Sequence, residues 1–187
     1  MSINKNIKLL LLWWNLRYLG EWMFGPLFAI FAEKVGGDIL DITRARSIYL
    51  IISGIMYIVV GRLIDKYDNK EIVMVSWYAL NALCTFLYLF VSSPRHLFVV
   101  QAWLGIAAAM ATPTRDALFS KYENKKKSGS QRWLAWWSAE IVTWIAIVIW
   151  GYIVSYFSFN VLFITMGIIQ IIATIYQAQI LRSCKSH

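Results

Sequence analysis

The chain has 187 residues, of which 59% are hydrophobic, with a mean hydropathy of +0.57 and a net charge of +8. A soluble domain of this length needs more polar surface to cover its core, so the composition excludes an ordinary soluble protein. The positive charge lies between apolar stretches rather than along one soluble face. This placement argues against nucleic acid as a partner and indicates a lipid bilayer.

Six apolar stretches occupy almost the whole chain, each close to the roughly 20 residues that cross a membrane. The first contains Arg17 and Glu21 and has no A-x-A-like cleavage site, so we expect a retained helix rather than a signal peptide. The stretches leave no room for a second domain, and the sequence predicts a single all-α transmembrane domain over residues 1–187. Its predicted helices cover residues 7–32, 47–63, 72–91, 97–118, 133–156 and 161–181.

Basic residues are distributed unevenly between the two predicted sides of the membrane. One side carries thirteen of them: Lys5, Lys8, Arg62, Lys66, Lys70, Arg115, Lys121, Lys125, Lys126, Lys127, Arg132, Arg182 and Lys185. The other side carries four: Lys34, Arg44, Arg46 and Arg95. Lys and Arg gather on the cytoplasmic side, so we expect both termini in the cytoplasm. The even number of predicted spans agrees, and the short loops are typical of a bacterial inner (plasma) membrane.

A charged turn follows the second stretch, and residues 61–70 read GRLIDKYDNK. This turn resembles the loop signature of the major facilitator superfamily, G-x-L-a-D-[RK]-x-G-R-[KR], which the family places between its second and third helices on the cytoplasmic side. Asp68 and Asn69 replace the family's Gly and basic residue. The matching positions are Gly61, Leu63, Asp65, Lys66 and Lys70.

Two further stretches resemble the same family. Gly25-Pro26 followed by Gly36-Gly37 is similar to its first helix and outer loop, and Leu104-Gly105-Ile106 followed by Pro113 and Arg115 is similar to its fourth helix. The resemblance implies an MFS-like half bundle of two three-helix repeats, which is half of the family's usual twelve helices. Two departures are clear: Gln101 stands where an Arg is frequent, and the fifth stretch lacks the Gly-Pro signature of drug/proton antiporters.

The loop motif has physical roles of its own. A small residue at Gly61 lets two helices approach closely, and Asp65 suits the positive end of a helix dipole. Lys66 and Lys70 can form charge pairs in one conformation and lose them in another. The resemblance implies that this loop latches against a second half. The alternative is a charged turn that only sets topology.

Ionisable groups inside spans are costly to bury, so each is a candidate for function. Arg17 lies near the predicted midplane, and Glu21 one turn later lies on the same face as Tyr18. This face could bind an anionic group at Arg17 or accept a proton at Glu21. The alternative is a structural ion pair that stabilises the bundle.

Three other polar residues lie within predicted spans. Glu140, about two turns into the fifth stretch, could gate the inner mouth of a pathway or pair with Arg132; it could equally be an interfacial residue without a transport role. Asn81 and Gln101 either line a pathway or make hydrogen bonds between helices.

The leading hypothesis is a half-size secondary transporter that moves a small solute by alternating access, as a homodimer or with a separate second half. One alternative is the six-helix substrate-binding subunit of an energy-coupling vitamin importer, which would not explain residues 61–70. Another is a non-transporting membrane scaffold or fragment. We expect no enzyme activity and no cofactor, because His96 and His187 are the only histidines and no cluster has metal-ligand spacing.

Overall fold

The computed structural model describes residues 5–21, 24–66, 70–123 and 128–184, and every regular element in these ranges is a helix. Some side chains within the ranges are outside the described part, among them those of Arg17, Glu21 and Lys70. The helices in chain order are α1 (Lys5–Glu21), α2 (Phe24–Lys34), α3 (Ile39–Lys66), α4 (Lys70–Leu87), the short 3₁₀ helix η1 (Tyr88–Phe90), α5 (Pro94–Tyr122), α6 (Ser128–Tyr156) and α7 (Phe159–Cys184).

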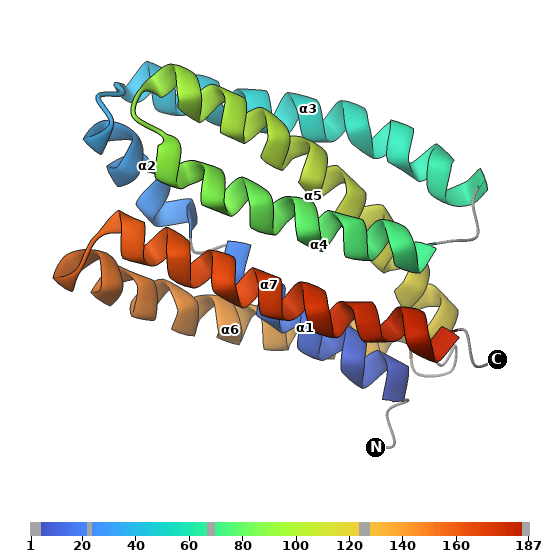
Figure 1. The fold of residues 1–187 in the computed structure, drawn as a ribbon. Helices are drawn as coiled ribbons and strands as arrows, with labels where there is room; N and C mark the ends of the chain where they lie inside the picture. The colour runs from blue at the N-terminus through green and yellow to red at the C-terminus, as the bar shows by residue number, and fades with distance from the viewer. Residues whose placement is uncertain (1–4, 22–23, 67–69, 124–127, 185–187) are drawn as a thin grey trace.

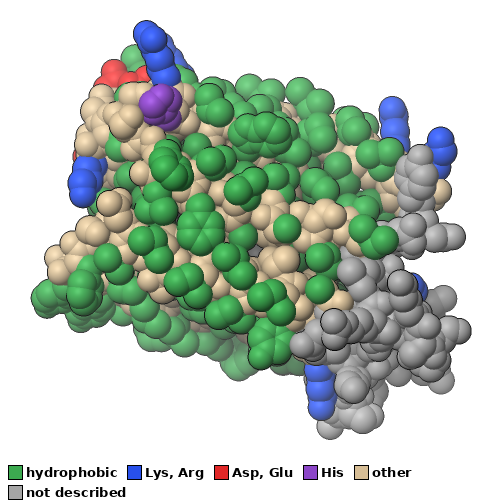
Figure 2. Space-filling model, in the orientation of Figure 1, with side chains coloured by type: hydrophobic (Ala, Val, Ile, Leu, Met, Phe, Trp, Pro, Cys, Tyr) green, Lys and Arg blue, Asp and Glu red, His purple; other side chains and the backbone are tan. Residues whose placement is uncertain are grey.

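Five stretches of the described chain are helical, long and apolar enough to cross a membrane: α3, α4 with η1, α5, α6 and most of α7. They overlie the second to sixth predicted stretches, although α3 begins at residue 39 rather than 47 and α6 at 128 rather than 133. Hydrophobic side chains cover the middle of the bundle surface in Figure 2, and the coloured charged groups lie toward its two ends. This distribution suits a protein that is embedded in a bilayer.

Two described helices, α1 and α2, overlie the first predicted stretch, 7–32, and residues 22–23 between them are outside the described part. Pro26 lies in the first turn of α2, where a backbone N–H would have no partner within the helix. A single helix running through this position would lose a hydrogen bond and meet the proline ring, and Gly25 beside it is also a poor helix former. Six continuous spans therefore stay a prediction.

The long helices lie side by side and alternate in direction (Figure 1). α1 begins and α7 ends at one end of the bundle, where α3 is followed by α4 and α5 by α6. Contacts join α3 to α5, α4 to both α5 and α7, and α1 to both α6 and α7. α3 and α6 are the least buried spans.

α4 and α7 pack against each other through both polar and aromatic contacts. The hydroxyl of Thr85 on α4 donates to Oε1 of Gln170 on α7 at 2.8 Å. At the next turn along, the ring of Tyr88 stacks on that of Phe163, with centroids 5.1 Å apart. Rising residue numbers on α4 thus meet falling numbers on α7, which is the register of an antiparallel pair.

Four buried rings close the bundle at the end that holds α2 and the start of α7. The ring centroid of Phe31 lies 4.9 Å from that of Phe163, 5.2 Å from that of Phe159 and 5.9 Å from that of Tyr88. Two of these contacts are edge-to-face, a geometry that the ring quadrupoles favour. We call this part of the molecule, Phe31, Tyr88, Phe159 and Phe163, the aromatic end.

Candidate functional site

The predicted pathway residues of α1 are only partly described. Arg17 and Glu21 belong to α1, but their side chains lie outside the described part of the chain, so their pairing stays a prediction. Tyr18 is buried, with its ring 4.7 Å from that of Trp14. Both rings cluster with Ala139 of α6. Tyr18 is therefore part of the contact between α1 and α6.

Asn81 and Gln101, also predicted for the pathway, are buried in the packing of α4 and α5. Nε2 of Gln101 donates to the Tyr88 hydroxyl at 3.3 Å. The backbone carbonyl of Asn81 accepts a hydrogen bond of 3.0 Å from Thr85. The bond of Gln101 suits the alternative of a polar contact between helices, worth about 1 kcal/mol, whereas the bond at Asn81 lies within α4 and uses only its backbone carbonyl. Their place in a pathway stays a prediction.

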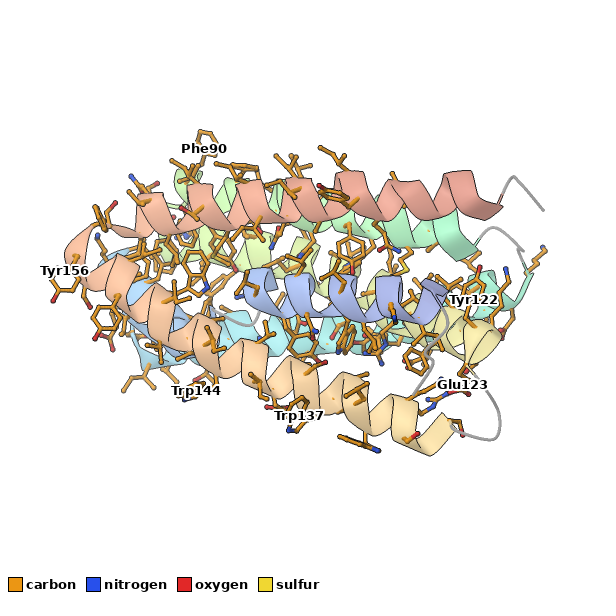
Figure 3. The ribbon with its side chains drawn as sticks, turned by 90° about the horizontal axis from the view of Figure 1, so that it is seen from below. Phe90, Tyr122, Glu123, Trp137, Trp144 and Tyr156 are labelled. Atoms are coloured by element: carbon orange, nitrogen blue, oxygen red, sulfur yellow. The ribbon has the colours of Figure 1, made fainter. Side chains whose placement is uncertain are left out.

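Glu140 lies on an exposed face of α6, near the middle of the helix. At 1.5 Å per residue it is about 18 Å from the first residue of α6 and about 24 Å from the last. It is deeper than the sequence indicated, because α6 begins earlier than expected. Trp137 and Trp144, about one turn to either side, project away from the bundle (Figure 3). Arg132, the partner considered for Glu140, instead forms an ion pair of 3.1 Å with Glu123.

The loop motif lies across the end of α3 and the start of α4. Leu63, Asp65 and Lys66 are exposed in the last turn of α3, and the side chain of Lys70 is outside the described part. Asp65 therefore stands at the end of one helix rather than in the first turn of the next. A Cβ placed on Gly61 would meet no atom within 4 Å. The close approach that we expected at Gly61 is thus not made by the described residues.

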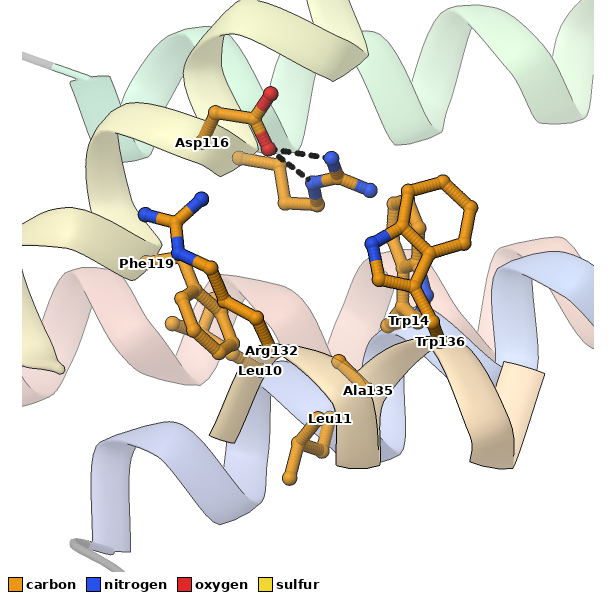
Figure 4. A pocket seen from close by; sticks show the side chains of 9 residues that line it. Leu10, Leu11, Trp14, Asp116, Phe119, Arg132, Ala135 and Trp136 are labelled. Carbon is orange, nitrogen blue, oxygen red and sulfur yellow. Dashed lines mark hydrogen bonds and ion pairs between the residues drawn. The ribbon is translucent and has the colours of Figure 1, made fainter. Parts of the chain in front are cut away.

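A small cavity that the sequence did not predict lies between α1, α5 and α6, at the end of the bundle where α1 begins (Figure 4). Its volume is about 40 Å³. We call this part of the molecule the charged end, because two arginines border the cavity. The lining residues are Leu10, Leu11 and Trp14 from α1, Arg115, Asp116 and Phe119 from α5, and Arg132, Ala135 and Trp136 from α6.

Arg115 is the most enclosed charge of this cavity. Its guanidinium lies 3.6 Å from the centre of the Trp14 ring, close enough for a strong cation–π contact. Nε of Arg115 donates to Oδ1 of Asp116 at 2.8 Å. The side chain of Arg115 is 18% exposed and that of Asp116 is 49% exposed, so the cation lies deeper than its counter-ion. The sequence indicates Arg115 as a charge that sets topology and as part of the resemblance of the fourth helix, but nothing in the chain order brings it to Trp14.

Arg132 borders the other side of the cavity and connects α6 to α5. Its Nε donates to Oε2 of Glu123 at 3.1 Å, and its Nη2 donates to the hydroxyl of Ser120, also at 3.1 Å. The guanidinium also lies over the ring of Phe119, 5.6 Å from its centroid. Glu123 does not line the cavity, so the cavity wall itself has two guanidinium groups and one carboxylate, that of Asp116.

The chemistry that these groups provide is ion and hydrogen-bond recognition. Among the side chains that the structure describes, no group of three His, Cys, Asp or Glu could hold a metal ion. Guanidinium groups bind carboxylates and phosphates with paired, charge-assisted hydrogen bonds. The indole rings of Trp14 and Trp136, whose centroids are 6.3 Å apart, add an apolar wall.

Comparison with known proteins agrees with the features of the bundle. The model of the Major Facilitator Superfamily matches residues 15–182 of this chain. The chain is also similar to an uncharacterized MFS-type transporter of Methanocaldococcus jannaschii, with 24% identity over 128 residues. That match covers 68% of this chain and 33% of the relative, so the chain spans about a third of the relative's length. Because the family model covers most of its residues, the chain belongs to the Major Facilitator Superfamily, a family of membrane transporters that are generally not enzymes.

Proposed function

We propose that this chain is one half of a secondary transporter, and that it moves a small solute by alternating access together with a second six-helix bundle. Family membership supports secondary transport as the class of function. Alternating access in such proteins rocks two bundles around a site near the bilayer midplane. A single bundle forms one wall of that site, so the second bundle is a necessary part of the proposal.

The pattern of helix contacts supports a division of the bundle into two three-helix repeats. If α1 with α2, α3 and α4 form the first repeat, then α5, α6 and α7 form the second. Exchanging the two repeats maps α1 onto α5, α3 onto α6 and α4 onto α7. The contact of α3 with α5 then becomes that of α6 with α1. The contact of α4 with α5 becomes that of α7 with α1. Both members of each exchanged pair are present, and the contact of α4 with α7 maps onto itself.

The distribution of charge supports an orientation with the charged end in the cytoplasm. The end where α1 begins and α7 ends also holds Arg115, Lys121 and Arg132, which belong to the more basic of the two predicted sides. Basic residues gather on the cytoplasmic side of membrane proteins. Both termini would then be cytoplasmic, and the plasma membrane of a bacterium is the location that we propose.

The proposal depends most on the exposed position of Glu140 near the middle of α6. An ionised carboxylate near the middle of a span costs about 2.5–3.5 kcal/mol or more if it faces lipid, so such groups face protein or a water-filled space. Glu140 is exposed on α6, between Trp137 and Trp144. This face of α6 is therefore suited to border an aqueous pathway, and we propose Glu140 for that pathway, with Arg17 and Glu21 as further candidates and Tyr18 buried beside them in the contact between α1 and α6.

Two features support a second bundle as the partner. Gly61 has open space beside it, which leaves room for the close contact that its motif provides in the family. The relative is about three times as long as the part that this chain matches. The second bundle would be a second copy of this chain, a separate chain, or the remainder of a longer one. Lys66, Lys70 and Asp65 would form the charge pairs between the two bundles.

Reconstitution of the full chain into vesicles tests the proposal. A pH-sensitive dye inside the vesicles would report proton movement as candidate solutes are added outside, and native mass spectrometry of the same protein in nanodiscs would give its oligomeric state. We expect a dimer whose solute-dependent flux is lost in Glu140→Gln and retained in Glu33→Gln, an exposed glutamate at the end of α2. A monomer without flux would contradict the homodimer, and flux that survives Glu140→Gln would remove that residue from the pathway.

A further inference from the structure

The cavity at the charged end has the composition of a binding site for an anion. Its wall holds the guanidinium groups of Arg115 and Arg132 and one carboxylate, that of Asp116, while Glu123 pairs with Arg132 from outside the wall, so a bound anion would replace these carboxylates as the partner of the two cations. Three helices contribute to it, so the positions of these groups are set by the packing of the bundle and not by one loop. The cavity of about 40 Å³ has room for about three groups of the size of a water molecule.

The guanidinium of Arg115 is positioned by neighbouring side chains before an anion binds. The Trp14 ring, whose centre lies 3.6 Å from the guanidinium carbon, covers one side of the cation and partly removes it from water. A desolvated, oriented guanidinium binds a tetrahedral or planar anion more strongly than a hydrated lysine does. Its counter-ion Asp116 is the more exposed member of the pair. An anionic ligand that arrives from solvent or from the headgroup layer therefore competes with Asp116 for the guanidinium of Arg115.

The depth of the cavity indicates where such a ligand comes from. Arg115 lies about 10 Å from the end of α5 and Arg132 about 6 Å from the start of α6, at 1.5 Å per residue. Both helices have 29 residues, or about 43 Å, so they extend several ångström beyond a hydrocarbon layer of about 30 Å at each end. The two arginines thus lie at the boundary between acyl chains and headgroups. The exposed rings of Trp133 and Trp136 suit the same boundary.

We infer that the cavity between α1, α5 and α6 binds the phosphate group of an anionic lipid, through Arg115 and Arg132, with the glycerol and acyl portions against Leu11 and Trp136. Basic pockets between transmembrane helices on the cytoplasmic side are suited to anionic headgroups. A water-soluble phosphate ester offers the same chemistry, and the experiment below separates the two sources. The site is independent of the proposed transport, because its occupancy can be measured without any solute.

Nanodiscs of defined composition test this inference. The full chain would be prepared in phosphatidylcholine alone and in phosphatidylcholine with phosphatidylglycerol, and native mass spectrometry would count the retained phosphatidylglycerol while thermal unfolding gives Tm. We expect retention of phosphatidylglycerol and a higher Tm in the mixed discs. Arg115→Gln should weaken retention by about tenfold or more, the scale of a lost charge-assisted hydrogen bond. The control Arg62→Gln changes an exposed arginine outside the cavity, on α3, and should retain the lipid.

Asp116→Asn is expected to change the retention of phosphatidylglycerol in the opposite direction to Arg115→Gln. Removing the competing carboxylate should strengthen retention of phosphatidylglycerol, whereas an arginine–aspartate pair with a purely structural role would leave retention unchanged or reduce it. If Arg115→Gln does not fold, Asp116→Asn and Arg132→Gln still test the site. Equal retention by the wild type and by all of these variants would overturn the inference.

Glycerol 3-phosphate added to phosphatidylcholine discs separates the sources. A rise in Tm that needs Arg115 and exceeds the effect of phosphatidylglycerol would assign the site to a soluble phosphate ester, and would overturn the lipid as its ligand. No effect of glycerol 3-phosphate, together with retention of phosphatidylglycerol, would support the lipid. A result negative for both ligands would refute a phosphate site while leaving the proposed transport untouched.

Discussion

The two ends of the bundle are built in opposite ways. At the aromatic end, the rings of Phe31, Tyr88, Phe159 and Phe163 fill the space between α2, η1 and α7. At the charged end, α1, α5 and α6 leave a cavity bordered by Arg115 and Arg132. Tight packing makes one end rigid, whereas a polar cavity admits water or a ligand. The aromatic end is therefore the closed end of the described bundle, and the charged end has the cavity that we call its mouth.

The largest loss of stability should come from removing a ring at the aromatic end. Phe163→Ala removes a ring that contacts Phe31, Tyr88 and Phe159. We expect the free energy of unfolding to fall by about 3 kcal/mol, the low end for Phe→Ala, because lipid or detergent also solvates the ring in the unfolded state. Unfolding by SDS in mixed micelles would measure the loss.

Phe119→Ala is the matched substitution at the charged end. Phe119 is also buried, but it borders the cavity, so its neighbours make fewer contacts with the ring and less packing is lost. We expect a loss of about half that of Phe163→Ala. Equal losses at the two positions would contradict the contrast between a packed end and a hydrated end.

An effect of comparable size should follow from adding one methyl group between α3 and α5. A Cβ on Gly105 would lie 2.9 Å from the backbone oxygen of Tyr49 and 3.2 Å from Cβ of Ile52, so one of the helices must shift. We expect Gly105→Ala to lower the free energy of unfolding by about 1–3 kcal/mol in the same assay. Gly54→Ala, on the exposed face of α3, meets nothing within 4 Å. It should be neutral or stabilising by up to about 1 kcal/mol, because Ala favours helix over Gly.

The outcome of Gly54→Ala also bears on the partner bundle. If the assembled protein, but not the isolated chain, is destabilised by Gly54→Ala, then the exposed face of α3 is packed against another bundle. Loss of stability in the isolated chain would instead mean that the open space beside Gly54 is filled by described parts of α3 or its neighbours, contrary to the structure.

Long apolar runs were enough to predict where α3 to α7 lie, because a span needs about 20 apolar residues and little else. The continuity of the first run stays a prediction, because residues 22–23 between α1 and α2 are outside the described part, although Pro26 and Gly25 favour the start of a helix nearby. Glu140 lies further from the start of its helix than the predicted range 133–156 indicated, because the polar residues Ser130 and Gln131 belong to the first turns of α6.

The candidate site could be predicted only in part, because function depends on which helix faces meet. Asn81 and Gln101 are polar residues within spans, and the sequence cannot distinguish a pathway wall from a buried contact such as that of Gln101 with Tyr88. The contact of Arg115 with Trp14 could not be predicted for the same reason, since Trp14 lies on a helix distant in the chain. The side chains of Arg17 and Glu21 lie outside the part that the structure describes, and their roles stay predictions.

The smallest effect should come from the ion pair of Arg132 with Glu123 at the charged end. The side chain of Arg132 is 47% exposed, so water screens the pair and long side chains must be ordered to form it. A double-mutant cycle of Arg132→Gln and Glu123→Gln should give a coupling of about 0.2–1 kcal/mol in detergent, decreasing with added salt. A coupling several times larger would mean that the charged end is as tightly held as the aromatic end, and the cavity would then be a fixed gap in the packing rather than a mouth. A small coupling would leave Arg132 able to exchange Glu123 for an anionic ligand, as binding at this cavity requires.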